Sequence, residues 1–194
     1  MSLRRPSPAK IQAFLEAQAK LKLTYEAIGA TSSVPPHGYV VDHTRIRLGE
    51  GEDFFLRAKS ALGRWAQFQL GWVEAWSTST PIRTGEVVAV LARRLGLWWL
   101  NACRIVYVID ERTPLPRFGF AYGTLPAHAG AGEERFLVEW DPESGEVWYD
   151  ILAFSRPQNR LTQFGRPYMR RVQKRFGRES AAAMRRAVQE DRTT

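Results

Sequence analysis

The sequence predicts an α+β fold in which a curved antiparallel sheet of six to eight strands wraps around a long C-terminal helix, with short helices near the N-terminus. Three observations predict it. Apolar residues at helical spacing come first along the chain, about eighty residues of β-rich sequence with short turns follow, and a long amphipathic segment comes last. Helices and strands that are segregated along the chain are typical of α+β domains.

The first residues are predicted to be helical. Residues 1–22 form an expected N-terminal helical extension, because Ile11, Phe14 and Leu15 recur at helical spacing after Pro8, which suits an early helical position.

The next segments alternate between strand-like and helical patterns. Residues 23–31 and residues 39–48 alternate in polarity, so each is predicted to be a strand. Residues 52–68 carry apolar side chains on one helical face and acidic residues in the first turn, so they are predicted to be a helix.

The middle of the chain is predicted to be a β-meander. Its segments are rich in β-branched and aromatic residues, and hairpin-length turns between them favour antiparallel pairing. The predicted strands are residues 72–77, 86–93, 101–110, 117–125, 134–140 and 147–154.

A long helix is predicted to close the chain, from about residue 167 to about residue 189. Pro167 suits its first turn, and a continuous apolar stripe follows. We therefore expect a single domain over residues 23–190, a short tail at residues 191–194, and a final helix that packs on the apolar face of the sheet.

The net charge of +8 invites a nucleic-acid interpretation, but it is unevenly placed. Residues 1–155 carry 17 basic and 17 acidic side chains, whereas residues 156–194 carry 11 basic and 3 acidic ones. The excess therefore lies in the last fifth of the chain, most of it on the predicted C-terminal helix. A solvated cationic face is the expected role, and binding to nucleic acid or to an anionic membrane surface stays an alternative. The candidate residues are Arg170, Arg171, Lys174 and Arg178.

Four strings carry a resemblance to known proteins: GYVVDHTRIRLGEGEDFF (38–55), ACRIVYVIDE (102–111), RFGFAYGTLPAHAGAGEERF (117–136) and YDILAFSRP (149–157). They resemble the family called domain of unknown function nineteen-ninety, which has no established activity. The order of elements also resembles the START and birch-pollen-allergen (SRPBCC) helix-grip superfamily. That resemblance implies a cavity between sheet and C-terminal helix that holds a lipid or another hydrophobic molecule.

The leading hypothesis is therefore a non-enzymatic protein that binds a hydrophobic or amphipathic small molecule. Alternating aromatic and tiny residues in the strand at residues 117–125 favour a ligand cavity, although plain core packing explains the same pattern. The expected apolar walls are Trp72, Phe118, Phe120, Phe136 and Tyr149, and the expected polar anchors are Arg104, Tyr122, His128 and Glu134. Arg104 shares an apolar-leaning strand face, so it needs an anionic partner such as Glu133, Glu134 or Asp150.

An enzyme that uses the same pocket is the alternative, with His128 and either Glu133 or Glu134 as acid and base. No nucleotide-binding loop or metal-ligand spacing is present, so no cofactor and no metal are predicted. No apolar run reaches the roughly 18 residues of a membrane helix. The single Cys103 fits a reducing compartment, so we expect a cytoplasmic protein. Exposed sheet edges leave a homodimer open.

Overall fold

The computed structural model describes residues 1–158 and 166–190. The predicted tail at residues 191–194 lies outside the described residues. The helices are α1 (Pro8–Ala19), α2 (Glu52–Gly63) and α4 (Arg166–Glu190), and two short 3-10 helices are η1 (Ala30–Ser32) and η2 (Ala66–Phe68). The strands are β1 (Val40–Glu50), β2 (Val73–Trp76), β3 (Val87–Arg94), β4 (Leu97–Glu111), β5 (Arg117–Thr124), β6 (Gly130–Trp140) and β7 (Glu146–Pro157).

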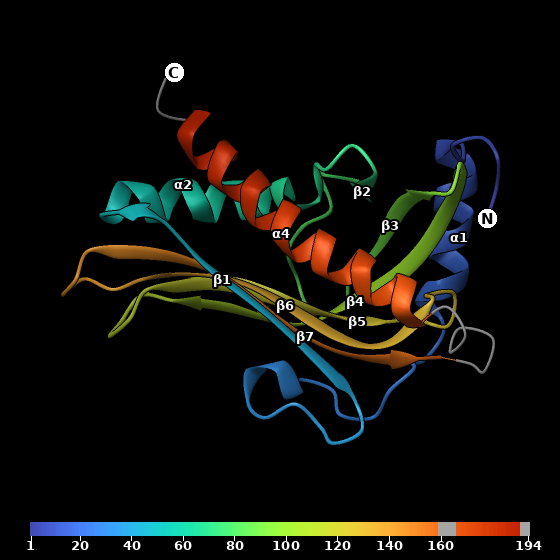
Figure 1. Cartoon of the computed structure of the whole chain (residues 1–194), viewed down its shortest axis with the longest axis horizontal. Helices are drawn as coiled ribbons and strands as arrows, with labels where there is room; N and C mark the ends of the chain where they lie inside the picture. The colour runs from blue at the N-terminus through green and yellow to red at the C-terminus, as the bar shows by residue number, and fades with distance from the viewer. Residues whose placement is uncertain (159–165, 191–194) are drawn as a thin grey trace.

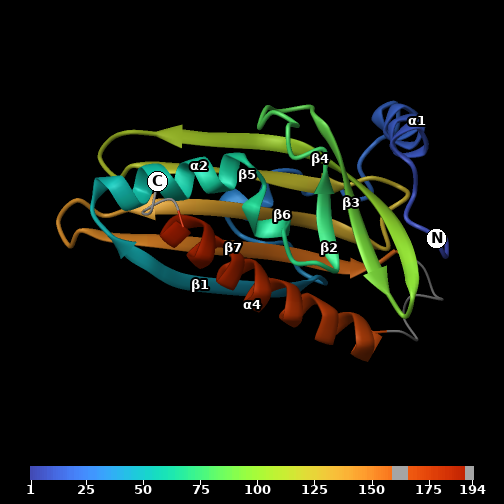
Figure 2. The same ribbon diagram turned by 90° about the horizontal axis from the view of Figure 1, so that it is seen from above.

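Within the described ranges, seven strands form one antiparallel sheet in the order β1-β7-β6-β5-β4-β3-β2. The sheet curves beneath α4, which runs diagonally across it, and α2 lies on the same side (Figures 1 and 2). This arrangement confirms the predicted α+β class, with its curved sheet and long C-terminal helix. None of the described helices is long and apolar enough to cross a membrane.

α1 packs on the convex face of the sheet. Ser7 caps the helix by accepting a hydrogen bond from the amide of Lys10, and Pro8 follows in the first turn. The helix buries Ile11 and Leu15 against β3. The predicted N-terminal helix is thus present, over a shorter span than residues 1–22.

The predicted strand at residues 23–31 is wrong. Among the described residues, a single backbone hydrogen bond joins this segment to the sheet, from the amide of Thr24 to the carbonyl of Thr124. The amides of Gly29 and Thr31 instead donate to the carboxylate of Glu133, which holds the segment in η1. A buried side-chain acceptor therefore replaces the ladder bonds that a strand needs.

The helix predicted for residues 52–68 ends early, at Gly63. Trp65 adopts a left-handed conformation with φ of +60°, and η2 follows. The change of direction buries Trp65 and Phe68, and the indole of Trp65 donates to the carbonyl of Thr80 at 2.9 Å. Burial of two large aromatic side chains therefore overrides helical continuity.

The main core lies between the concave face of the sheet and the two helices α2 and α4. A β-bulge in β4 between Ile105 and Tyr107, and another in β1 between Arg47 and Gly49, bend the sheet. The C-terminal half of α4 fills the core with Ala181, Met184 and Val188. Its N-terminal half spans the curved sheet, and a cavity lies beneath it.

Candidate functional site

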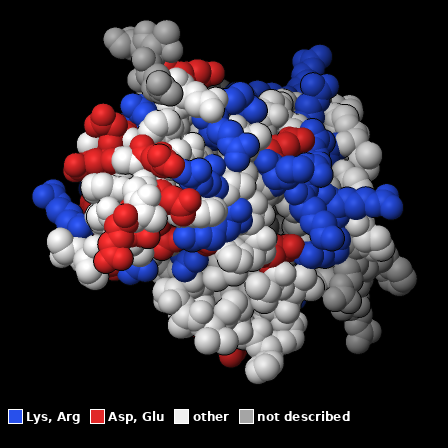
Figure 3. Space-filling model, turned by 60° about the vertical axis from the view of Figure 1, so that its left-hand side comes forward, with Lys and Arg blue, Asp and Glu red and all other residues white. Residues whose placement is uncertain are grey.

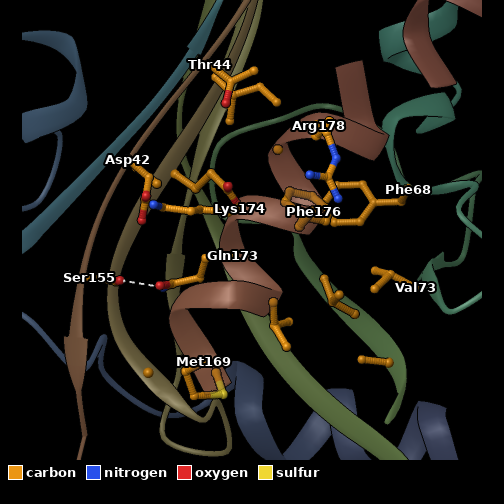
Figure 4. A pocket seen from close by; sticks show the side chains of 18 of the residues that line it. Asp42, Thr44, Phe68, Val73, Ser155, Met169, Gln173, Lys174, Phe176 and Arg178 are labelled. Carbon is orange, nitrogen blue, oxygen red and sulfur yellow. Dashed lines mark hydrogen bonds between the residues drawn. The ribbon is translucent and has the colours of Figure 1, made fainter. Parts of the chain in front are cut away.

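A cavity of about 600 Å³ lies between the concave face of the sheet and α4. Phe176 projects from α4 toward Phe68 and Val73, and Thr44 and Asp42 stand on the opposite wall (Figure 4). The rings of Phe68 and Phe176 are 5.3 Å apart between centroids. Further apolar wall comes from Ile46, Trp72, Val90, Ala92, Ile151, Met169 and Val172. A volume of this size fits a small-molecule ligand.

Four side chains form a row across the sheet that faces the cavity. Asp42 of β1 lies opposite Ala153 of β7, Ala153 lies opposite Glu134 of β6, and Glu134 lies opposite Tyr122 of β5. All four residues line the cavity. Because directly opposed residues point to the same face, strand register alone places the polar side chains of Asp42, Glu134 and Tyr122 in one row.

Glu134 is the most perturbed carboxyl group of the cavity. Burial raises its pKa to about 7, the hydrogen bond from Tyr122 works in the other direction, and the charge of Asp42 adds to the rise. The hydroxyl of Tyr122 donates to Glu134 at 2.8 Å, and burial raises the pKa of Tyr122 well above its ordinary value. Near neutral pH, Glu134 can therefore hold or release a proton inside an apolar cavity.

Glu133 has a different role from its neighbour. Successive strand side chains alternate in direction, so its carboxylate lies on the convex side, against η1. It accepts hydrogen bonds from the hydroxyl of Tyr25 at 2.6 Å, the amide of Gly29 at 2.7 Å, and the amide and hydroxyl of Thr31 at 3.0 and 2.5 Å. Glu133 and His128 both belong to the residues that line the cavity. The four donors to the Glu133 carboxylate come from Tyr25, Gly29 and Thr31, however, and His128 is not among them.

His128 stands at the β5–β6 connection, close to the end of β3. Its Nδ1 lies 3.0 Å from both the amide nitrogen and the carbonyl oxygen of Gly130. Burial lowers the pKa of His128 to about 4, the hydrogen bond that a protonated Nδ1 donates to the Gly130 carbonyl opposes this, and the charge of Arg94 adds to the lowering. At neutral pH the ring is therefore uncharged.

The predicted ligand residues are divided between the cavity and the rest of the protein. Trp72, Tyr122, His128 and Glu134 line the cavity. Three of the predicted aromatic residues are fully buried in the packed core instead: Phe120, Phe136 and Tyr149. The fourth, Phe118, packs against this core, and the Nζ of Lys59 lies 4.8 Å from the centroid of its ring. These four aromatic side chains belong to the core or pack against it, and they are not among the residues that line the cavity.

Arg104 also lies away from the cavity. The expected acidic partner is wrong, because its guanidinium donates to the carbonyls of Ala19 and Leu21 at 2.7 and 3.0 Å. The bulge in β4 explains the difference. Val108 faces the core, and the extra residue before it places Arg104 on the opposite, convex face beside the end of α1.

Arg94 lines the cavity and was not among the residues predicted from the sequence. It follows Val88, Val90 and Ala92 on the core-facing side of β3. That alternation in the sequence is the signal that could have found it.

The predicted basic residues lie along the N-terminal half of α4, where Lys and Arg side chains gather on the surface (Figure 3). Arg170 forms a two-pronged ion pair with Asp42. Arg171 is exposed. Lys174 and Arg178 contribute to the cavity wall (Figure 4). Of the four predicted basic residues, Arg170 is thus neutralised by Asp42, and Lys174 and Arg178 line the cavity.

The described residues contain no cluster of three or more His, Cys, Asp or Glu side chains that could hold a metal ion. A curved sheet that grips a long helix above an internal cavity defines a helix-grip protein.

Comparison with known proteins places the chain more closely. It belongs to the family described as "Domain of unknown function (DUF1990)", whose model matches residues 24–183. It is 34% identical to a "UPF0548 protein" of Dictyostelium discoideum, over 95% of this chain and 94% of that protein. It is 37% identical to a "UPF0548 protein" of Deinococcus radiodurans, over 96% and 98%.

A solved structure supports the fold. Ara h 8.0201 is similar with a TM-score of 0.53 and 12% identity, over 79% of this chain and 99% of that one. At this identity the similarity shows the fold alone. The family and the helix-grip fold implied by the sequence resemblance are thus both confirmed.

Proposed function

We propose that the protein binds a hydrophobic or amphipathic small molecule in the cavity between the sheet and α4. The observation that carries the proposal is an internal space of about 600 Å³ with mostly apolar walls and a few converging polar groups. Spaces of this volume with mostly apolar walls and a few polar groups are the usual sites of small-molecule ligands.

The wall chemistry supports an elongated, largely apolar ligand. Phe68, Phe176 and Val172 present apolar surface, and each methylene group that they cover contributes roughly 0.8 kcal/mol. Tyr122 and Glu134 offer a hydrogen-bonded polar pair on the sheet side. Polar groups of this kind orient a ligand more than they hold it.

A cavity-filling variant tests the proposal. Ala153 lines the cavity between Asp42 and Glu134, so Ala153→Trp should occlude the space. Ala13→Trp is the matched control, because Ala13 is exposed on α1. We expect a fluorescent amphipathic probe such as 1-anilinonaphthalene-8-sulfonate to bind the native chain and the control, and to bind Ala153→Trp at least tenfold more weakly. Equal binding by all three proteins would contradict the proposal.

Acid–base catalysis in the same cavity is the second candidate, and the observation that favours it is Glu134. A buried carboxyl group with a pKa of about 7 can accept and return a proton near neutral pH. Untargeted mass spectrometry of a metabolite extract incubated with the native chain would show a product that Glu134→Gln does not form. Identical profiles for the two proteins would remove this candidate.

Binding of an anionic surface by α4 is a weaker candidate, supported by the exposed Arg171 and Lys174. It predicts steeply salt-dependent binding to anionic vesicles or to DNA, which Arg171→Glu should weaken. Salt-independent or absent binding would remove it.

The cytoplasmic location and the homodimer stay predictions. Fractionation of cells tests the first, and analytical ultracentrifugation tests the second.

A further inference from the structure

We propose that Arg94 recognises an oxyanion on the bound molecule, so that the ligand of the cavity is an amphiphile with a carboxylate or phosphate head. This inference rests on the proposed function. It adds the chemical class of the ligand and the residue that selects it.

The position of Arg94 is the first argument. Arg94 is the last residue of β3, on the same strand face as Val90 and Ala92, and all three line the cavity. Met169 of the first turns of α4 and His128 of the β5–β6 connection stand at the same end. The guanidinium therefore lies where the end of a strand, a loop and the start of α4 enclose one end of the cavity.

The missing partner of Arg94 is the second argument. Its Nε is buried and has no hydrogen-bond partner. Among residues 1–158 and 166–190, the one acceptor that the guanidinium reaches is the thioether sulfur of Met169, 3.5 Å from a terminal nitrogen. A thioether is a weak acceptor, so most of the five N–H donors of this side chain are available to a ligand.

The electrostatic surroundings of Arg94 are the third argument. Burial lowers its pKa below the ordinary value, and the phenol of Tyr168 opposes this. Arginine keeps its charge in proteins, so the free-energy cost of partly burying the Arg94 guanidinium is not relieved by loss of a proton. A bound anion would offset this cost. Three carboxyl groups belong to residues that line the cavity, and each has other partners: Asp42 pairs with Arg170, Glu134 accepts a hydrogen bond from Tyr122, and Glu133 accepts from the segment that contains η1. None of them forms an ion pair with Arg94 in the described part of the chain, so its positive charge has no directly bound counter-ion.

The shape of the guanidinium sets the ligand chemistry. Its planar fork matches the two oxygens of a carboxylate or of a phosphate, and such two-pronged bonds are stronger than neutral ones. The neutral His128 beside it adds no repulsion toward an anion. From Met169, the apolar wall on α4 continues through Val172 and Phe176 to Ala181, about 18 Å along the helix at 1.5 Å per residue. An anionic head at Arg94 thus leaves an apolar tail against this wall.

Three ligands and two variants test the inference by isothermal titration calorimetry. The ligands are dodecanoic acid, dodecyl phosphate and dodecanol, which share a tail and differ in the head group. Arg94→Met removes the guanidinium and keeps an unbranched apolar stem. Arg93→Met is the matched control, because Arg93 is the adjacent residue, exposed on the other strand face.

The native chain and Arg93→Met should bind at least one of the two anionic ligands ten or more times as tightly as dodecanol. Arg94→Met should lose this preference and bind dodecanol unchanged. The tighter of the two anions identifies the head group. Unchanged preference in Arg94→Met would overturn the inference while leaving the proposed function standing, whereas absence of binding of all three ligands by the native chain would overturn both. If Arg94→Met does not fold, as judged by urea unfolding, Arg94→Lys replaces it; it keeps the charge, loses the fork and should reduce the preference.

Discussion

The protonation of Glu134 gives a quantitative prediction for stability. Burial raises its pKa from the ordinary 4.5 to about 7, so between these values the folded protein binds more protons than the unfolded chain. The free energy of unfolding therefore falls as pH rises from about 4.5 to 7, and above pH 7 the contribution of Glu134 no longer changes. At about 1.4 kcal/mol per pH unit, the full effect is about 3 kcal/mol. Glu134→Gln removes this ionisation and keeps an oxygen that accepts the hydrogen bond from Tyr122.

Urea unfolding at pH 5 and pH 8 measures the effect. We expect Glu134→Gln to resemble the native chain near pH 5 and to be about 3 kcal/mol more stable at pH 8. Other titrating groups, His128 included, cancel in the difference between the two proteins. Glu143→Gln is the control, because Glu143 is exposed in the β6–β7 turn, and its difference should stay near zero. A difference that does not change with pH, or a Glu134→Gln protein that is less stable at pH 8, would refute the reasoning.

Three further substitutions test the supporting structure by urea unfolding. A Cβ at Gly123 would lie 2.2 Å from the hydroxyl of Tyr25, so Gly123→Ala should cost about 2 kcal/mol, and an unchanged midpoint would contradict this packing. Asp150→Asn should lower the free energy of unfolding by about 3 kcal/mol at pH 7 and by less near pH 3. Burial raises the pKa of Asp150, but hydrogen bonds from His43 and Arg135 outweigh this effect and hold the pKa below its ordinary value of 3.8. A loss of stability that is equal at the two pH values would contradict this role of the ionised carboxylate. Arg170→Gln should cost about 1 kcal/mol through its pair with Asp42 while Arg171→Gln costs almost nothing; equal costs would count against that pair.

Much of the fold follows from local pattern. Short turns and β-rich segments predict an antiparallel meander, and the apolar stripe at residues 167–189 predicts the helix that packs on it. The errors arise where a distant group decides local structure. Residues 23–31 alternate like a strand, but the carboxylate of Glu133, about a hundred residues away, takes their amides. No local pattern contains that contact.

The site is predictable only in part, for the same reason. The sequence identifies Tyr122 and Glu134 as candidates, yet strand register is what places them side by side. Arg104 and Arg94 show the limit most clearly. Each is an arginine in a β-rich segment, and a single bulged residue turns one to the convex face while the other faces the cavity.

The most direct test of the central claim is a crystal structure of the full chain grown with dodecanoic acid. We expect electron density for the acid inside the cavity, with the carboxylate within hydrogen-bond distance of Arg94 and the tail against Val172 and Phe176. A cavity filled by protein side chains, or one that holds ordered water while the acid is absent or bound elsewhere, would contradict the claim that this space is a ligand site.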